Sequence, residues 1–234
     1  MAEKVVEIRG LTYAWAGQAP ILKIDAFEIA ERERVFLRGP SGSGKSTLLG
    51  VIAGLFEVQN GHVSVVNVPL ERKNRAVRDR LRADHFGVIF QMFNLVPYLS
   101  LIQNVALPCR FSKRRMAAVK KAGGPELEAR RLLSRLGLEG DHILRRDVTE
   151  LSVGQQQRVA AARALIGGPS LIIADEPTSA LDANTRDRFI ELLSEEANNS
   201  GASMLFVSHD TGLASLFDRS VDLHEINSAG AETL

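Results

Sequence analysis

Residues 39–46 place the strongest constraint on what this chain of 234 residues can fold into. Their sequence, GPSGSGKS, fits the pattern G-x-x-x-x-G-K-[ST]; it follows an apolar run at 35–37 and precedes a predicted helix over 46–55. Glycines in such a loop let backbone N–H groups point at phosphate oxygens, and the positive end of the helix dipole adds to the attraction. The sequence therefore predicts a site for the phosphates of a nucleotide.

Two side chains of this loop have predicted roles of their own. Lys45 supplies a point charge for the β- and γ-phosphates, and Ser46 offers a hydroxyl to Mg²⁺. An incidental glycine-rich turn is the alternative interpretation, but the order of strand, loop and helix disfavours it. The predicted phosphate-binding residues are Gly39, Pro40, Ser41, Gly42, Ser43, Gly44, Lys45, Ser46 and Thr47.

Two further apolar runs, at 171–174 and 204–207, also end in polar residues. Runs of this kind are typical of buried parallel strands, whose carboxyl ends meet at one edge of a sheet, where ligands bind. Asp175 is predicted to hold Mg²⁺ through water, and Glu176 to orient and polarise the attacking water. His209, at the end of the last run, can donate to a γ-phosphate.

Composition narrows the class of protein further. With 29 basic and 28 acidic side chains the net charge is +1, which argues against whole-protein binding to nucleic acid. One cysteine rules out an internal disulfide and a cysteine-rich zinc site. Residues 86–109 carry no charge and are long enough to span a bilayer, but their amides and prolines predict a buried or partner-facing segment instead. We therefore expect a cytoplasmic protein that contacts a membrane only through a partner.

The rest of the chain shows helical and antiparallel patterning. Residues 5–29 alternate as antiparallel strands do, with a turn near 17–18, and 87–165 is predicted to be a mostly helical insertion. The basic runs at 72–82 and 110–121 are expected to be solvated faces, and contact with anionic lipid or a partner is the alternative. Further helices are predicted over 125–136, 155–165 and 183–197.

Taken together, the motifs resemble those of ABC-type ATPases. Residues 151–159, LSVGQQQRV, look like the signature motif of that family, and 176–182, EPTSALD, resemble the stretch that follows its second carboxylate. Gln91 resembles the glutamine of the family's Q-loop, and His209 resembles its switch histidine. The resemblance covers nearly the whole chain, with the motifs in the family's order.

This resemblance implies the fold class and its division. We expect an α/β fold: a P-loop NTPase core with a mostly parallel sheet, an N-terminal antiparallel β subdomain and a helical signature subdomain. The chain 1–234 would be a single cassette. Within it, 1–86 and 166–234 would form the nucleotide-binding core, and 87–165 the Q-loop and signature subdomain.

The resemblance also implies a Mg²⁺-dependent ATPase that works as a homodimer, in which two copies sandwich two ATP molecules head to tail. Ser152, Gly154 and Gln155 of one copy would close on the phosphates held by the other, and Asp182 would bond near the opposite phosphate loop. On the residues alone, Ser152 is equally well explained as an ordinary helix cap. Gln91 would contact Mg²⁺ and water and link the site to the partner-facing surface.

Alignment with the family's N-terminal strand places Trp15 at the adenine-stacking position. Tyr13, two residues earlier on the same strand face, is the second choice. The alternative is that Trp15 simply packs within the antiparallel subdomain.

Residues 87–108 resemble one subgroup, the bacterial ATPases for lipoprotein release, macrolide efflux and cell-division signalling. That resemblance implies integral membrane permease subunits as partners, at the cytoplasmic face of the bacterial inner membrane. Two residues depart from the patterns: Val153 replaces a glycine of L-S-G-G-Q, and Gln103 replaces the acid of an E-N-V triplet. The competing interpretation, a soluble regulatory or DNA-repair ATPase of the same superfamily, is disfavoured by the single cassette, the lack of a heptad run and the single cysteine.

Overall fold

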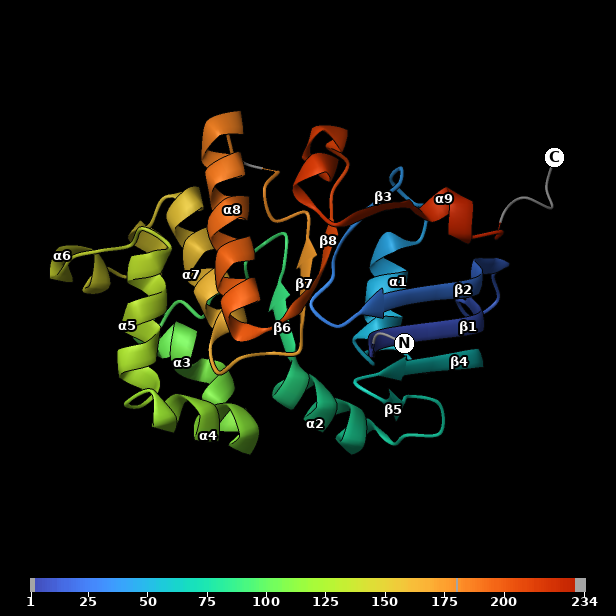
Figure 1. Cartoon of the computed structure of the whole chain (residues 1–234), viewed down its shortest axis with the longest axis horizontal. Helices are drawn as coiled ribbons and strands as arrows, with labels where there is room; N and C mark the ends of the chain where they lie inside the picture. The colour runs from blue at the N-terminus through green and yellow to red at the C-terminus, as the bar shows by residue number, and fades with distance from the viewer. Residues whose placement is uncertain (1–2, 180, 230–234) are drawn as a thin grey trace. The chain divides into compact units, whose positions relative to one another are not determined.

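The computed structural model describes residues 3–179 and 181–229, so Ala180 of the predicted 176–182 stretch lies outside the described residues. The chain divides into two compact units, each coloured along its sequence in Figure 1. Unit 1 comprises Met1–Arg82 and Ser203–Leu234, and unit 2 comprises Ala83–Ala202. Helix α2 (Arg75–His85) leads along the chain from unit 1 to unit 2.

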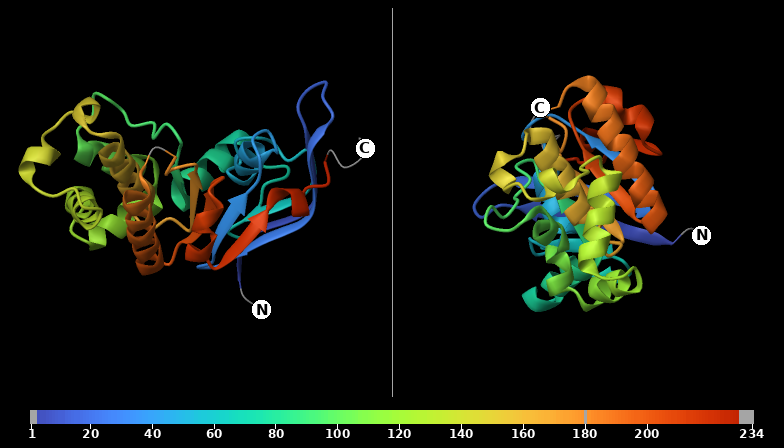
Figure 2. Two further views of the ribbon diagram at one scale, coloured as in Figure 1. Left: turned by 90° about the horizontal axis from the view of Figure 1, so that it is seen from above. Right: turned by 90° about the vertical axis from the view of Figure 1, so that its left-hand side faces the viewer.

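An antiparallel sheet of order β2-β1-β4-β5 forms one layer of unit 1. Its register pairs Ile8 with Phe27 and Leu11 with Ile24. All four of these side chains are buried. Burial alternates along each strand on either side of two successive exposed residues, 9–10 in β1 and 25–26 in β2, where the alternation shifts by one residue. The antiparallel prediction for 5–29 is confirmed, and Figure 2 shows the β1–β2 hairpin edge-on. The strands are β1 (Lys4–Ala14), β2 (Pro20–Ala30), β4 (Asn60–Val65) and β5 (Val68–Pro69).

Three parallel strands form the second layer of unit 1. Strand β3 (Arg34–Arg38) lies between β8 (Ser203–Val207) and β9 (Arg219–Asp222), with Leu37 opposite both Val207 and Val221. The run at 35–37 is wholly buried, as expected of a strand covered on both faces. Helix α1 follows β3 and its loop. The helical segments of this unit are α1 (Lys45–Ile52), the 3-10 turn η2 (Thr211–Leu216) and α9 (Leu223–Ile226).

Unit 2 consists of a parallel strand pair and a set of helices. Strands β6 (Phe86–Ile89) and β7 (Leu171–Asp175) pair in parallel, and the chain between them is mostly helical, in green to yellow in Figure 1. The helices predicted over 125–136, 155–165 and 183–197 are confirmed as α5, α7 and α8. The helical segments are α3 (Leu101–Phe111), α4 (Lys113–Lys121), α5 (Pro125–Arg135), α6 (Asp141–Leu144), η1 (Val148–Glu150), α7 (Val153–Leu165) and α8 (Ala183–Ser200).

Helix α7 packs directly on strand β6. A Cβ atom added at Gly87 would lie 2.3 Å from the carbonyl oxygen of Ala164, so only a glycine permits this approach. Small apolar residues of α7, among them Ala160, Ala161 and Ala162, are fully buried. The backbone of the helix and that of the strand are therefore in contact.

The prediction that both basic runs are solvated faces is wrong for two of their arginines. Arg115, 1% exposed, donates to the carbonyl oxygens of Phe86, Ala164 and Ile166 and so caps the C-terminal end of α7. Burial lowers its pKa to about 10, which still leaves it charged at neutral pH. Arg78 is also buried and pairs with Glu57 at 2.9 Å.

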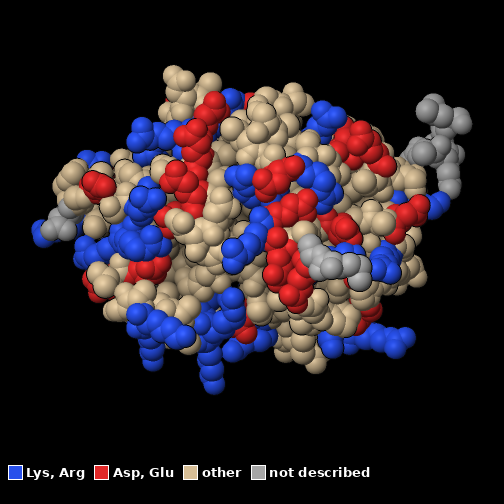
Figure 3. All heavy atoms as spheres, in the orientation of Figure 1, with Lys and Arg blue, Asp and Glu red and all other residues tan. Residues whose placement is uncertain are grey.

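The surface mixes both signs of charge. Figure 3 shows Lys and Arg interspersed with Asp and Glu over the face in view, in line with the net charge of +1. No helix among the described residues is both long enough and apolar enough to cross a bilayer. The uncharged segment 86–109 forms β6, a loop and most of α3.

Candidate functional site

The predicted phosphate loop lies in unit 1, between the end of β3 and the start of α1. Gly44 adopts φ 101°, and a Cβ there would lie 2.9 Å from Cδ2 of Leu22, so both conformation and space require glycine. Ser43 Oγ is buried and has no hydrogen-bond partner among the described residues. A buried hydroxyl of this kind needs a partner, and a phosphate oxygen bound by the loop would provide one.

Lys45 is held by the loop itself. Its Nζ donates to the carbonyl oxygens of Gly39 at 2.7 Å and Pro40 at 2.8 Å. Helix α1 begins at Lys45 and has no acidic residue in its first turn, so its positive end is not neutralised from within the helix. Ser46, in that turn, is exposed, and Thr47 is buried. The loop therefore presents a cation, a hydroxyl and a helix N-terminus together.

Trp15 lies just beyond β1 in an aromatic cluster with Tyr13 and Phe56. Its ring meets Tyr13 edge-on with centroids 5.3 Å apart and Phe56 with centroids 5.0 Å apart. Trp15 is 38% exposed and Tyr13 only 6%, so Tyr13 supports the indole and has no free face to offer a base. Phe56, which follows α1, was missed by the sequence analysis, although an aromatic residue close to the glycine loop was a usable signal.

His209 and the phosphate loop lie at the same edge of the parallel strands of unit 1. Leu37 of β3 pairs with Val207 of β8, and Gly39 and His209 each follow two residues beyond this pair. The turn after β8 is fixed by Asp210, whose N–H donates to Ser208 Oγ at 3.2 Å. The structure thus brings the exposed His209 to the edge that the sequence predicted.

The strand-end carboxylates and Gln91 gather at one edge of unit 2. Ile89 of β6 pairs with Ala174 of β7, so Gln91 and Glu176 again lie two residues beyond a matched pair. Asp175 is the last residue of β7 and is partly exposed. Glu176 adopts φ 47°, a left-handed conformation that costs a non-glycine residue roughly 1–3 kcal/mol. Its backbone carbonyl accepts a hydrogen bond from Ser179 Oγ at 3.2 Å.

The predicted signature residues form the beginning of α7. Gln155 N–H donates to Ser152 Oγ at 3.3 Å, and Ser152 N–H donates to Gln155 Oε1 at 3.0 Å. The helix-cap interpretation of Ser152 is therefore confirmed, and its use as a phosphate clamp stays a prediction. The two roles are compatible, because Oγ accepts in the cap while its own hydroxyl proton is left to donate.

Gly154 lies beside the start of α8. A Cβ at Gly154 would stand 3.4 Å from Cδ2 of Leu181, next to Asp182. Asp182 caps α8 by accepting from the N–H of Thr185 at 3.0 Å, and that backbone hydrogen bond holds the pKa of its carboxyl below the usual value. Val153, the first residue of α7, is 47% exposed, so its side chain is on the surface where the family pattern has none.

Two polar residues of unit 2, one buried and one partly buried, were missed by the sequence analysis. Asn104, fully buried in α3, accepts from Val96 N–H at 2.8 Å and donates to the Val96 carbonyl at 3.0 Å. Arg163, partly buried in α7, donates to the carbonyls of Phe93 and Asn94. Asn104 directly precedes the apolar stretch 105–109 of α3, and Arg163 interrupts the apolar stretch 159–165 of α7, so a polar residue beside or within an apolar stretch was the available signal for both.

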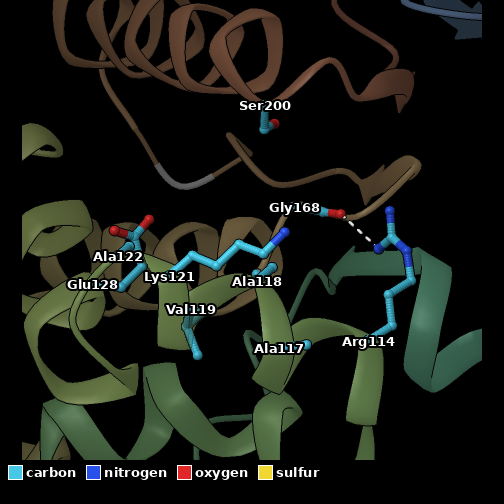
Figure 4. Close-up of a pocket in the computed structure, with 10 residues that line it drawn as sticks. Arg114, Ala117, Ala118, Val119, Lys121, Ala122, Glu128, Gly168 and Ser200 are labelled. Carbon is cyan, nitrogen blue, oxygen red and sulfur yellow. Dashed lines mark hydrogen bonds between the residues drawn. The ribbon is translucent and has the colours of Figure 1, made fainter.

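The predicted residues do not line the hollow shown in Figure 4. This hollow of about 430 Å³ in unit 2 is bordered by α4, by the turn at 167–168 and by Ser200 at the end of α8. Arg114 at its rim donates to the carbonyl of Gly168 at 2.8 Å. The described residues also contain no group of three or more His, Cys, Asp or Glu side chains able to hold a metal.

Comparison with known proteins gives consistent matches over almost the whole chain. A family model described as "ABC transporter" matches residues 22–179. The uncharacterized ABC transporter ATP-binding protein YbbA of Escherichia coli is 38% identical over 227 residues, 95% of each chain. The lipoprotein-releasing system ATP-binding protein LolD of Hydrogenovibrio crunogenus is 39% identical over 208 residues, 89% of this chain and 87% of that one.

Solved structures agree with these relatives. The dimeric structure of MJ0796, a bacterial ABC transporter cassette, has a TM-score of 0.80 and 34% identity over 93% of both chains. A dimeric post-hydrolysis state of MJ0796, bound to ADP and Pi, has the same values. CbiO1 from Clostridium perfringens, part of the ABC transporter complex cbiONQ, has a TM-score of 0.80 and 26% identity over 94% of this chain and 84% of that one.

Proposed function

This chain belongs to the family of ABC transporter ATP-binding proteins, and on that premise we propose that it hydrolyses ATP to drive a membrane permease. Its fold is the α/β P-loop NTPase fold of the ABC cassette. The observation that carries the proposal is the phosphate loop, which requires glycine at Gly44 and holds the Lys45 ammonium on its own carbonyls. The buried Ser43 hydroxyl of this loop has no hydrogen-bond partner in the part of the chain that the structure describes.

Binding of ATP begins with the loop and the indole. The phosphates would accept from backbone N–H groups of the loop, which all residues of 39–47 except Pro40 carry. Lys45 would exchange the carbonyls of Gly39 and Pro40 for the β- and γ-phosphate oxygens. A charged phosphate oxygen is a stronger acceptor than a neutral carbonyl, so the exchange is favourable. Trp15, with an accessible face supported by Tyr13 and Phe56, would stack on adenine.

Hydrolysis uses the strand-end side chains. Glu176 would orient and polarise the attacking water, Gln91 would contact that water, and His209 would donate to the γ-phosphate. The left-handed backbone at Glu176 ends the extended conformation directly after β7. A backbone held at such a cost is typical of functional positions.

The residues at these edges also fit Mg²⁺. Ser46, Asp175 and Gln91 offer hydroxyl, carboxylate and amide oxygens, the donor type that Mg²⁺ prefers, and P-loop sites use few carboxylates because phosphate supplies further oxygens. Bound there, Mg²⁺ would neutralise charge that develops on the β- and γ-phosphate oxygens.

We propose that two copies form the working unit. Ser152, Gly154 and Gln155 of a second copy would close on the phosphates, with Asp182 near the opposite loop. The dimeric cassettes among the similar structures support this arrangement. The N-terminus of α7 has no acidic residue in its first turn, so it can approach an anion without repulsion from its own helix.

The proposed permease is one for lipoprotein release, peptide or drug export, or mechanical signalling, because a lipoprotein-releasing ATP-binding protein is among the relatives. The loop after Gln91 exposes large apolar side chains, with Met92 80% and Tyr98 86% exposed, as a surface that binds another protein would. The protein would then act at the cytoplasmic face of the bacterial inner membrane. Functionally, 1–86 with 166–234 would bind nucleotide, and 87–165 would face the permease.

The substitution Glu176→Gln tests this function. It removes the base while keeping the length of the side chain, so the variant should form a stable dimer at saturating Mg-ATP, measured by size-exclusion chromatography with light scattering. Adding Lys45→Ala to the variant should abolish the dimer by preventing ATP binding. A Glu176→Gln variant that stays monomeric while ATP is bound would contradict the sandwich.

The partner can be tested with the same variant. Tagged Glu176→Gln, incubated with detergent-solubilised membranes and Mg-ATP, should retain an integral membrane permease, identified by mass spectrometry. Recovery of soluble proteins alone, from membranes that contain the expressed permeases, would favour a soluble regulatory ATPase instead.

A further inference from the structure

We propose that Arg163 is a positioning residue that fixes the turn carrying Gln91 to the helix that begins with the signature residues. This inference rests on the proposed function, because it assigns Arg163 an effect on hydrolysis through Gln91. The residues concerned all lie in unit 2.

The turn at 90–94 has an unusual backbone. Phe93 N–H donates to the carbonyl of Phe90 at 2.9 Å, which makes Gln91 an interior residue of a tight turn. Phe93 and Asn94 both adopt left-handed conformations, with φ 58° and 49°. Two consecutive non-glycine residues in that region are held there only when the surroundings compensate for the strain.

Arg163 supplies that compensation. Its guanidinium donates to the carbonyl of Phe93 at 2.5 Å and to that of Asn94 at 2.7 Å, so one rigid fork spans both strained residues. No carboxylate among the described residues pairs with it. Burial lowers the pKa of Arg163, because the side chain gives up hydration to reach these carbonyls. A partly buried cation whose side-chain hydrogen bonds go to one turn is well suited to fixing that turn.

The other end of the loop is anchored separately. Asn104 of α3 accepts from Val96 N–H and donates to the carbonyls of Val96, Leu99 and Ser100. Asn104 therefore fixes the part of the loop that leads into α3. Arg163 fixes the part that carries Gln91, and it does so from α7.

Helix α7 joins this anchor to the signature residues. Arg163 lies ten residues after Val153, a distance of about 15 Å along a helix. Because α7 is continuous and packs on β6 without intervening side chains at Gly87, a shift of its N-terminus carries the guanidinium and the turn with it. Engagement of Ser152 with a second copy's nucleotide and placement of Gln91 would thus occur together.

A double-mutant cycle with Gln91→Ala tests the proposal. Arg163→Ala should lower kcat for ATP roughly 10- to 100-fold, because small displacements of a positioned group are costly, and should leave KM for ATP nearly unchanged. In the Gln91→Ala background the same substitution should have almost no further effect on kcat. If the two effects multiply instead, Arg163 does not act through Gln91 and the proposal is wrong.

Arg114→Ala is the matched control. Arg114 is likewise an arginine of unit 2 that donates to two backbone carbonyls, those of Asp84 at 3.0 Å and Gly168 at 2.8 Å, as Figure 4 shows for the second. Its substitution should lower thermal stability and leave kcat unchanged. A fall in kcat equal to that of Arg163→Ala would mean that kcat responds to general loosening of unit 2, and would overturn the proposal.

Arg163→Lys keeps the experiment decisive if Arg163→Ala does not fold. An ammonium cannot span both carbonyls as the planar fork does, so kcat should be intermediate and should again show no further loss with Gln91→Ala. The wild-type chain separates this inference from the proposed function. If the wild type binds ATP without hydrolysing it, the proposed function fails; if it hydrolyses ATP and the effects multiply, only the role of Arg163 fails.

Discussion

Ser100 and Gln103 cap helix α3 reciprocally: Gln103 N–H donates to Ser100 Oγ at 3.2 Å, and Ser100 N–H donates to Gln103 Oε1 at 3.0 Å. Gln103 is the residue that replaces the acid of the subgroup pattern. Because Glu and Gln serve equally in this capping box, the replacement keeps the cap and removes only a charge from the positive end of the helix.

Gln103→Glu should therefore raise the free energy of unfolding by about 0.3–1 kcal/mol, through interaction of the carboxylate with the helix dipole. Gln103→Ala, which removes the side-chain acceptor, should lower it by about 1 kcal/mol. Urea unfolding followed by circular dichroism measures both. Equal stabilities of the wild type and the alanine variant would show that the cap does not stabilise the fold.

Val153→Gly restores the residue that the family pattern has in the signature. We expect ATP turnover to rise, because in the proposed sandwich the N-terminus of α7 could approach a second copy's phosphates more closely without the exposed valine side chain. The free energy of unfolding should fall by about 0.5–1 kcal/mol, the usual cost of glycine in a helix. Val153→Ala separates the two effects, since it removes bulk without adding backbone freedom. A drop in turnover for both variants would mean that the valine assists the clamp.

Trp15→Ala should raise KM for ATP roughly 10-fold, the equivalent of about 1.4 kcal/mol of stacking, with kcat unchanged. Trp15→Phe should keep most of the affinity. Because Trp15 is the single tryptophan of the chain, its fluorescence also reports directly on nucleotide binding. An unchanged KM in Trp15→Ala would show that Trp15 does not stack on adenine and only packs against Tyr13 and Phe56.

Stability should depend on pH through His85. Its ring nitrogen Nδ1 lies 3.0 Å from Ser170 Oγ, and burial, assisted by the charge of Arg114, holds the pKa of His85 below 6.5 in the folded state. The unfolded chain therefore binds a proton more readily than the folded one. This contribution to stability is fully present above pH 6.5 and is lost as the pH falls through the lower folded-state pKa.

Unfolding by urea at several values between about pH 5 and 8 measures this dependence. His85→Gln, which keeps a hydrogen-bonding side chain without titrating, should flatten the part of the profile below pH 6.5, where the unfolded chain binds the proton more readily than the folded one. An unaltered profile in the variant would assign the dependence to other groups.

The strands that the sequence predicted share one property. The runs at 35–37, 171–174 and 204–207 are apolar at every position, because each strand is covered on both faces, and β3, β7 and β8 contain them. Strand β9 was not predicted, because it lies at the end of the order β8-β3-β9 and its sequence, RSVD, is mostly polar. A short strand at the edge of a sheet with a mostly polar sequence has no apolar run, so hydrophobic patterning does not predict it.

The candidate site was predictable where local sequence determines geometry. The glycine loop, the strand-end acids and the Ser152–Gln155 cap each depend on a few neighbouring residues. Arg115 and Arg163 were not predictable in the same way, because both donate to backbone carbonyls of segments that are distant in sequence. The division at 87 and 165 remains a prediction, and the compact unit 2 extends further because β7 pairs with β6 and α7 contacts α8.

Gly87 has a consequence for how this sequence can change over evolutionary time. A side chain at that position would meet the carbonyl of Ala164 at 2.3 Å, and backbone atoms, unlike side chains, cannot be exchanged by mutation to make room. No second substitution therefore compensates for the loss of this glycine. A saturation library selected for growth should tolerate many residues at the exposed position 127, but only glycine at 87.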